Sequence, residues 1–275
     1  MLTGYLIYEK ENVERNRRFI DMFMEAAQKH HVSLRLVTVD EITYGTRDGE
    51  YFLFPEKPDF AVMRCMQPLL SAHLEDMGVP VFNNAQVSRI CNDKRLTHRF
   101  LTKHGLPTLP TAFVNMQMPR HPFSYPVVLK AANGCGGRKV FMCKDADAYH
   151  EKLTLIAPDD AVVQPLCDTP GRDVRVYMLD GKPLQAMLRY SDGDFRSNFG
   201  LHGTAKPIEP TEEMLQMCEK IASLLHPDLV GIDFIFHEGK TYLNEIEDAV
   251  GTRMLYQYTP LQVVDLYMEH ILHSL

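Results

Sequence analysis

The feature that most constrains the fold is the alternation of short apolar runs with helical segments over the first 90 residues. Apolar runs cover residues 4–8, 33–39, 60–63 and 79–82, and helical segments are expected near 13–30 and 68–77. Strands separated by helices form parallel βαβ units, so this region predicts an open sheet with helices on both faces. Arg64 follows a strand directly, at the carboxyl edge where such sheets bind ligands.

A cluster of prolines marks the end of this pattern. These residues lie between positions 107 and 126 and prevent a helix from running through, so a connector is expected there. Beyond them strands predominate, at 127–131, 139–143, 161–164, 173–179 and 184–190, with one helix near 145–155. A helix at 211–225, a hairpin of 229–236 and 240–246, and a C-terminal helix from 261 follow. The α/β beginning therefore gives way to an α+β pattern.

Composition excludes several classes of protein. The 29 Lys and Arg residues against 36 Asp and Glu give a net charge of -7, which argues against a nucleic-acid-binding protein. The 6 cysteines are scattered without a C-x-x-C pair, as in a reduced cytosolic compartment. Apolar runs are far shorter than the roughly 18 residues of a membrane helix, and no signal peptide opens the chain. We therefore expect a cytoplasmic protein without membrane or nucleic-acid partners.

Common nucleotide and hydrolase motifs are missing, including the P-loop, the Rossmann G-x-G-x-x-G and H-E-x-x-H. A different phosphate-binding pattern occurs after the apolar strand 127–131. Lys130 is followed by Gly134, Gly136 and Gly137, which let a backbone approach a phosphate chain and present its N–H groups. The lysine supplies a point charge for the same anion. A glycine-rich hairpin with a surface lysine explains these residues equally well.

Carboxylates gather on the predicted C-terminal hairpin. Glu245 and Glu247 are two apart on a strand and so share a face. A three-residue turn would place Asp233 opposite Glu245, whereas a two-residue turn would not, and the turn residues leave both open. Three carboxylates on one face repel one another without a cation, and oxygen ligands suit Mg²⁺ or Mn²⁺ shared with phosphates. The alternative is a solvated acidic strand face.

Arginines recur around the strands 173–179 and 184–190. They are Arg172, Arg175, Arg189 and Arg196, the last followed by Ser197 and Asn198. A guanidinium group can donate two parallel hydrogen bonds to the oxygens of a phosphate or carboxylate. Taken singly, each arginine is better explained as a surface salt-bridge partner.

In chain order, a series of short segments resembles an ATP-grasp ligase of the RimK-type α-L-glutamate ligase branch. They are residues 92–94 (Asn-Asp-Lys), 128–130 (Val-Leu-Lys), 134–137, 162–164 (Val-Val-Gln), 171–176 (Gly-Arg-Asp-Val-Arg-Val), 193–198 (Gly-Asp-Phe-Arg-Ser-Asn), 231–233 (Gly-Ile-Asp) and 244–247 (Asn-Glu-Ile-Glu). The match spans residues 85–255, and its order is more specific than any one segment. It implies an ATP-grasp fold with an N-terminal pre-ATP-grasp domain (1–90), a lid subdomain (91–165) and a C-terminal subdomain with a metal site (166–275).

The resemblance assigns roles to individual residues. For ATP it implies contacts from Lys94, Lys130, Gly134, Gly136, Gly137, Gln164, Pro165, Leu166, Asp173, Arg196, Ser197 and Asn198. Within this set, residues 164–166 form the hinge that faces adenine. For Mg²⁺ or Mn²⁺ it implies Asp233 and Glu245 as ligands, with Glu247 at a third position where the family usually has Asn. The family's Ser-Pro-Gly reads Ala-Val-Gly at 249–251, a departure that bears on the acceptor more than on the ATP site.

The resemblance also implies a reaction. A substrate carboxylate attacks the γ-phosphorus of ATP to give an acyl phosphate and ADP, and an amine then displaces phosphate. Arg189, Arg196 and Arg253 are the candidates for stabilising the acyl phosphate. The central part would close as a lid and exclude water. The expected partners are a small carboxylate and a small amine, with a peptide or protein acceptor and a homo-oligomer left open.

Two other functions use the same residues. A phosphotransferase of this fold would move the γ-phosphate to a hydroxyl with the same metal and phosphate apparatus. A non-catalytic nucleotide-binding protein would not need metal ligands beside phosphate-binding cations. The Asp233 and Glu245 pair and the two lysines therefore argue against that function. The identity of the carboxylate and of the amine does not follow from any pattern in the chain.

Overall fold

The computed structural model describes the chain apart from residues 135–136, 138, 192 and 198–203. Its N-terminal part is a parallel sheet of β1 (Thr3–Tyr8), β2 (Ser33–Thr38), β5 (Phe60–Met63) and β6 (Val81–Phe82), in the order β2-β1-β5-β6. This is the sheet that the alternation of apolar runs predicts. Strands β1, β5 and β6 are buried on both faces, whereas β2 at one edge of the sheet is partly exposed.

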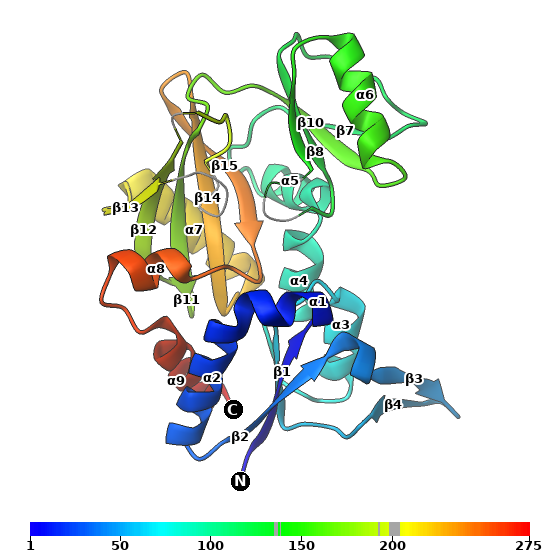
Figure 1. Ribbon diagram of the computed structural model, residues 1–275, viewed down its shortest axis with the longest axis vertical. Coiled ribbons are helices and arrows are strands. Elements are labelled where there is room, and N and C mark those ends of the chain that lie inside the picture. The colour runs from blue at the N-terminus through cyan, green and yellow to red at the C-terminus, as the bar shows by residue number, and fades with distance from the viewer. Residues whose placement is uncertain (135–136, 138, 192, 198–203) are drawn as a thin grey trace.

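Helices cover both faces of this sheet (Figure 1). Leu6 and Tyr8 of β1 pack towards α2 (Arg17–Lys29) and the C-terminal helix α9 (Val263–Ser274), whereas Tyr5 and Ile7 pack towards α3 (Pro68–Asp76). The expected helix 13–30 is divided into α1 (Lys10–Val13), a 3₁₀ turn at Glu14–Asn16 and α2. A second 3₁₀ turn, Val39–Glu41, follows β2.

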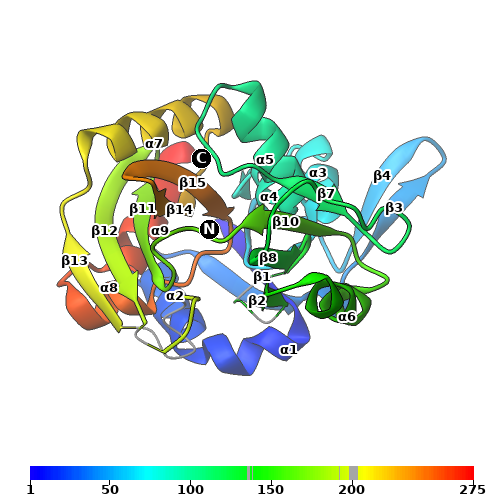
Figure 2. The ribbon, with the colours of Figure 1, turned by 90° about the horizontal axis from the view of Figure 1, so that it is seen from above.

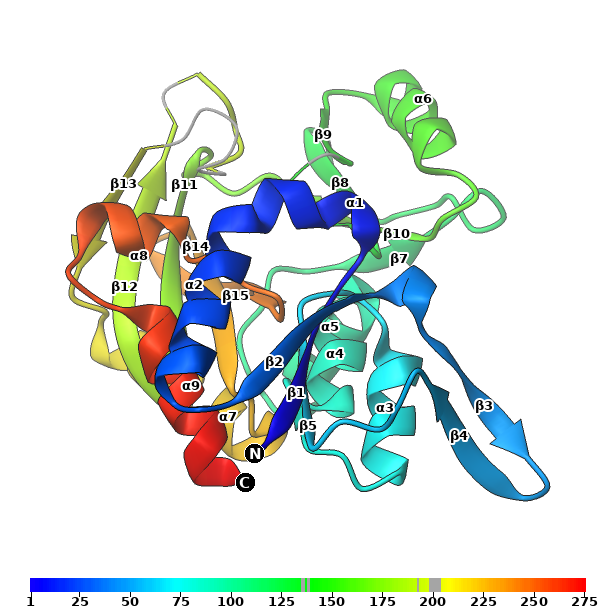
Figure 3. The same cartoon turned by 60° about the horizontal axis from the view of Figure 1, so that its bottom comes forward.

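A hairpin of β3 (Thr43–Arg47) and β4 (Glu50–Phe54) projects from this region (Figure 3). The sequence analysis does not predict it. Its turn residues Asp48 and Gly49 both have positive φ, at 55° and 85°, as a type I′ turn requires. The Asp-Gly dipeptide and the apolar run at 51–54 were thus the available signals, but neither strand contains a buried residue.

The second sheet is antiparallel, in the order β7-β10-β8-β9. Its strands are β7 (Ala112–Val114), β8 (Val127–Ala131), β9 (Val140–Cys143) and β10 (Ala161–Pro165). One face packs on α6 (Ala146–Ile156) through side chains such as Leu129 and Leu153. Alternate residues of β8 and β10 therefore point to the opposite face. The short strand β7 lies inside the proline-rich segment that was expected to be a connector.

The third sheet is also antiparallel, in the order β13-β12-β11-β14-β15. Its strands are β11 (Arg172–Leu179), β12 (Lys182–Tyr190), β13 (Thr204–Ile208), β14 (Leu229–His237) and β15 (Lys240–Glu247). Helices α4 (Ala85–Cys91), α5 (Lys94–Lys103) and α7 (Glu212–Leu225) cover one face, where they pack on Val174, Val176 and Ile232. The alternate residues Arg175 and Asp233 lie on the other face.

One hydrophobic cluster joins the N-terminal part of the molecule to the third sheet. It runs from α2, α9 and β1 to Tyr177 of β11, Met187 of β12 and the short helix α8 (Arg253–Tyr258). Buried Asn83, which follows β6, bonds across the same junction: it donates to the Leu229 carbonyl (3.0 Å) and to Asp248 Oδ1 (2.8 Å). Seen from above (Figure 2), the second sheet and the third sheet stand on opposite sides of the central region. No helix in the described ranges is long and apolar enough to cross a membrane.

Candidate active site

A cavity lies between the second and third sheets. On the second sheet it is lined by the face turned away from α6, and on the third sheet by the face that carries Arg175 and Asp233. It collects predicted site residues from segments far apart in the chain. Those that line it are Lys94, Lys130, Gly134, Gly137, Gln164, Pro165, Leu166, Asp173, Arg189, Arg196, Ser197, Asp233, Glu245 and Glu247. Gly136 and Asn198 lie outside the described residues. The convergence of these side chains is what a single nucleotide site requires.

Arg253 is the described candidate that the cavity does not include. It is exposed at the first position of α8 and follows the loop after β15. Its prediction rested only on its place after Gly251, and the chain turns into a helix at that point. The geometry gives Arg253 no contact with the reacting region.

The C-terminal hairpin brings Asp233 directly opposite Glu245, although its turn has only two residues. His237 pairs with Lys240 across Glu238 and Gly239, which both have positive φ. A register irregularity after Asp233 then shifts the pairing, so that Phe234 faces Leu243 and Asp233 faces Glu245. Such a bulge inserts one residue into a strand and changes which residues oppose each other. The expected pairing is therefore achieved by a bulge and not by a three-residue turn.

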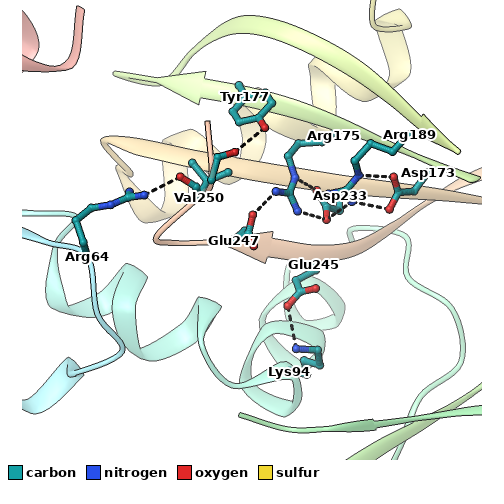
Figure 4. A network of polar contacts seen from close by, with 11 residues as sticks. Arg64, Lys94, Asp173, Arg175, Tyr177, Arg189, Asp233, Glu245, Glu247 and Val250 are labelled. Carbon is teal, nitrogen blue, oxygen red and sulfur yellow. Dashed lines mark hydrogen bonds and ion pairs between the residues drawn. The ribbon is translucent and has the colours of Figure 1, made fainter. Parts of the chain in front are cut away.

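Two buried arginines hold Asp233 (Figure 4). Arg175 donates from Nε to Asp233 Oδ1 and from Nη2 to Oδ2, both at 2.7 Å. Arg189 donates from Nη2 to Asp233 Oδ2 at 2.7 Å, and it makes two further bonds to Asp173. Burial raises the pKa of Asp233, but the two guanidinium groups outweigh this effect and the pKa lies below its usual value. Asp233 is therefore a carboxylate.

Arg175 also donates to Glu247, through Nη1 (Figure 4). Burial raises the pKa of Glu247, and this outweighs the opposite effect of Arg175. Arg175 stood among the arginines that could bind an anion, but no individual role was predicted for it, because a single arginine is more readily explained as a surface salt-bridge partner. Its position two residues after Asp173, on the same face, was the signal that could have found it.

Lys94 connects three parts of the site. Its ammonium group donates to Glu245 Oε1 (2.9 Å) and to the carbonyl of Gly134 (2.7 Å), and its backbone N–H donates to Ala132 (3.0 Å). Its side chain is 9% exposed. The first residue of α5 thus joins the glycine-rich loop to β15.

Lys130 has a different environment. It donates to Oδ1 of Asn244 (2.8 Å), a neutral amide. Burial, partly offset by Glu245, lowers the pKa of Lys130 to about 8. No carboxylate among the described residues lies within ion-pair distance of this ammonium group. It is a cation suited to an anionic ligand.

Arg196 reaches the glycine-rich loop from the other side of the cavity. Its Nη1 donates to the carbonyl of Gly137 (2.9 Å), and its Nη2 pairs with Asp194 (2.7 Å). Gly137 has φ of 73°, a conformation that favours glycine. Loop and arginine are thereby held next to each other at the cavity.

The carboxylates have the chemistry of a magnesium site, since all donors are oxygen atoms at a phosphate-sized cavity. Within the described part of the chain, however, no three acidic, His or Cys side chains are placed to hold an ion. In this arrangement Arg175, Arg189 and Lys94 pair with the carboxylate oxygens. The donor set fits Mg²⁺ or Mn²⁺ once a carboxylate exchanges its cationic partner for the metal.

Comparison with known proteins agrees with this fold. The chain is 28% identical to beta-citrylglutamate synthase B of Danio rerio over 91% of its own length and 68% of that protein. It is 26% identical to the alpha-aminoadipate–LysW ligase LysX of Saccharolobus solfataricus, over 62% of this chain and 66% of that protein.

Solved structures are similar over nearly the whole chain. A D-alanine–D-alanine ligase from Bacillus anthracis in complex with ATP superposes with a TM-score of 0.74 at 16% identity, over 100% of this chain and 98% of that one. The ATP-grasp ligase PsnB gives a TM-score of 0.70 at 15% identity, over 100% and 99%. The fold is therefore the ATP-grasp fold. The family model for the RimK-like ATP-grasp domain matches residues 91–271, and the chain belongs to that family.

Proposed function

We propose that this ATP-grasp ligase joins the carboxylate of an amino acid or small acid to an amine, through an acyl phosphate, with release of ADP and phosphate. The observation that carries the proposal is the cavity in which Lys94, Lys130 and the glycine-rich loop meet Asp233 and Glu245. Such a site neutralises phosphates at one end and offers metal ligands at the other.

Each group has a proposed role. Lys94, Lys130 and Arg196 neutralise the phosphates, and residues 164–166 face adenine, next to the apolar side chains of Val128 and Ile235. Asp233, Glu245 and Glu247 would hold Mg²⁺ or Mn²⁺, which supplies charge neutralisation between the phosphates. Arg189 lies beside Asp233 and neutralises charge on the transferring group. The second sheet, with α6, acts as the lid that excludes water.

The relatives suggest the class of substrate. Their names contain acidic amino acids: citrylglutamate, N-acetylaspartylglutamate, aminoadipate and glutamate. We propose that one substrate of this enzyme is likewise an acidic amino acid. For the two relatives that act on LysW, the names identify a further ligation partner, and a peptide or protein acceptor belongs to the same proposal.

A screen of ADP release tests the proposal. Purified protein with magnesium ATP is offered pairs of acidic amino acids and small acids with amines, and ADP is measured together with the mass of the product. We expect ADP to form only when carboxylate and amine are both present. ADP release that needs a hydroxyl acceptor and no amine would instead identify a phosphotransferase.

A further inference from the structure

A buried polar network lies directly behind Gln164 at the adenine end of the cavity. His98 of α5 and Gln164 of β10 are both 2% exposed. Gln164 Nε2 donates to Thr111 Oγ1 (2.9 Å) and lies 3.3 Å from His98 Nε2. His98 Nδ1 lies 2.6 Å from Thr108 Oγ1. These contacts fix the direction in which the Gln164 amide points.

The proton positions follow from the donor and acceptor inventory. A glutamine amide carries two N–H donors, and Thr111 takes one of them. His98 Nε2 can take the other only if it carries a lone pair, which places the imidazole proton on Nδ1, where it donates to Thr108. Burial, together with Lys130 and Lys94, lowers the pKa of His98 to about 3. His98 is therefore neutral near pH 7 and keeps one donor and one acceptor.

The opposite end of the amide is thereby left for a ligand. Both N–H groups of Gln164 point towards His98 and Thr111, while Gln164 itself lines the cavity with Pro165 and Leu166. In the described structure, Nε of Arg64 is the only fully buried side-chain polar atom without a partner, so Gln164 Oε1 is not such an atom. Because Nε2 faces His98 and Thr111, the Oε1 carbonyl, an acceptor, is directed away from both of them.

We propose that His98 is a positioning residue for nucleobase selection: through the Gln164 amide it presents a hydrogen-bond acceptor to the 6-amino group of adenine. The inference rests on the proposed function, in that ATP must bind in this cavity. Adenine carries a donor at this position, whereas guanine carries an oxygen acceptor. Two acceptors facing each other leave both unpaired, and a site built to bond a donor rejects the analogue that lacks it.

Calorimetric titration of the full chain with ATP, GTP and purine riboside triphosphate, which lacks the 6-amino group, tests this assignment. We expect the wild type to bind ATP on the order of 10-fold more tightly than the purine analogue and at least about 100-fold more tightly than GTP. In His98→Leu the amide can turn over, so the preference for ATP over GTP should fall by about 10-fold or more. His98→Gln, which restores a carbonyl acceptor, should recover most of the preference.

His104→Leu is the matched control, because His104 caps the same helix and lines neither this cavity nor the network. It should leave the ratio of ATP to GTP affinity unchanged. An unchanged ratio in folded His98→Leu would overturn the inference. If that variant does not fold, His98→Met, which also lacks the ring acceptor, takes its place, and an unchanged ratio there has the same meaning. A wild type that binds no ATP would overturn the proposed function and this inference with it, whereas ATP binding with unaltered ratios overturns the inference alone.

Discussion

The two walls of the cavity carry their positive charge in different ways. On the wall formed by the second sheet, Lys130 donates to the neutral amide of Asn244, and burial lowers the pKa of Lys130 to about 8. On the opposite wall, Arg175 and Arg189 are each paired with carboxylates at 2.5 to 2.7 Å. An unbalanced buried cation favours binding of an anion, whereas a balanced network stabilises the empty fold and must rearrange for a metal. The wall with Lys130 therefore favours binding of an anionic ligand, whereas the wall with Arg175 and Arg189 stabilises the fold without a ligand.

The largest expected effect is on the balanced wall. Asp233→Asn would leave two buried guanidinium groups short of a charge partner, and breaking a buried ion pair costs about 3–5 kcal/mol of unfolding free energy. Urea denaturation measures it. Glu245→Gln is the matched control: its side chain is 29% exposed, and Lys94 keeps its bond to Gly134, so a loss of about 1 kcal/mol is expected. Equal losses in the two variants would contradict the view that the two arginines make Asp233 the more important carboxylate for stability.

The next effect concerns the unbalanced wall and its response to pH. A bound polyphosphate stabilises the charged form of Lys130, while the free protein loses this proton near pH 8. ATP affinity should therefore fall above pH 8, by up to about tenfold per pH unit, because phosphates are already ionised there. Calorimetry between pH 7 and 9.5 checks this.

Lys130→Met keeps the aliphatic stem without the charge. It should weaken ATP binding at pH 7 by about 10- to 100-fold and flatten the dependence on pH. A variant that retains the wild-type slope would show that another group is responsible.

The smallest effect is expected at Glu247, which pairs with a buried arginine but has a raised pKa. Because burial raises its pKa despite Arg175, its charge adds little stability to the empty fold, and Glu247→Asn should change the melting temperature without metal only slightly. Metal binding relieves the repulsion among the carboxylates, so Mg²⁺ should raise the melting temperature of the wild type. This rise should be smaller in Glu247→Asn by about 2 °C, or roughly 1 kcal/mol. Equal rises in the melting temperatures of the wild type and Glu247→Asn during a magnesium titration would mean that Glu247 pairs with Arg175 and does not bind the metal.

Periodicity was enough to predict the buried strands. The strands expected at 60–63 and 127–131 are β5 and β8. A short continuous run of apolar residues between turn signals is typical of a buried strand. It was not enough for β3, β4 and β13, which are short and partly exposed and owe their existence to neighbouring strands. Local pattern carries little information where tertiary pairing decides the structure.

At the site, the sequence predicted residues that line the cavity but not those that hold them in place. Lys130 and Asp233 stand in recognisable segments. His98 stands in no such segment. Arg175 does, but its contact with Asp233, like that of His98 with Gln164, depends on a partner more than fifty residues away. The pairing of Asp233 with Glu245 likewise depended on a bulge that turn residues alone do not reveal.

The junction at Asn83 has a consequence for dissecting this protein. Its side chain also accepts hydrogen bonds from the backbone N–H groups of Asp228 (2.7 Å) and Leu229 (3.1 Å), so one amide from the first sheet completes the start of β14. Excision of the segment 91–271 that matches the family model would leave these groups unsatisfied and would expose the apolar side of Tyr177 and of α9. The N-terminal sheet is thus a built-in folding partner of the catalytic region, and a minimal, transplantable ligase module has to include it.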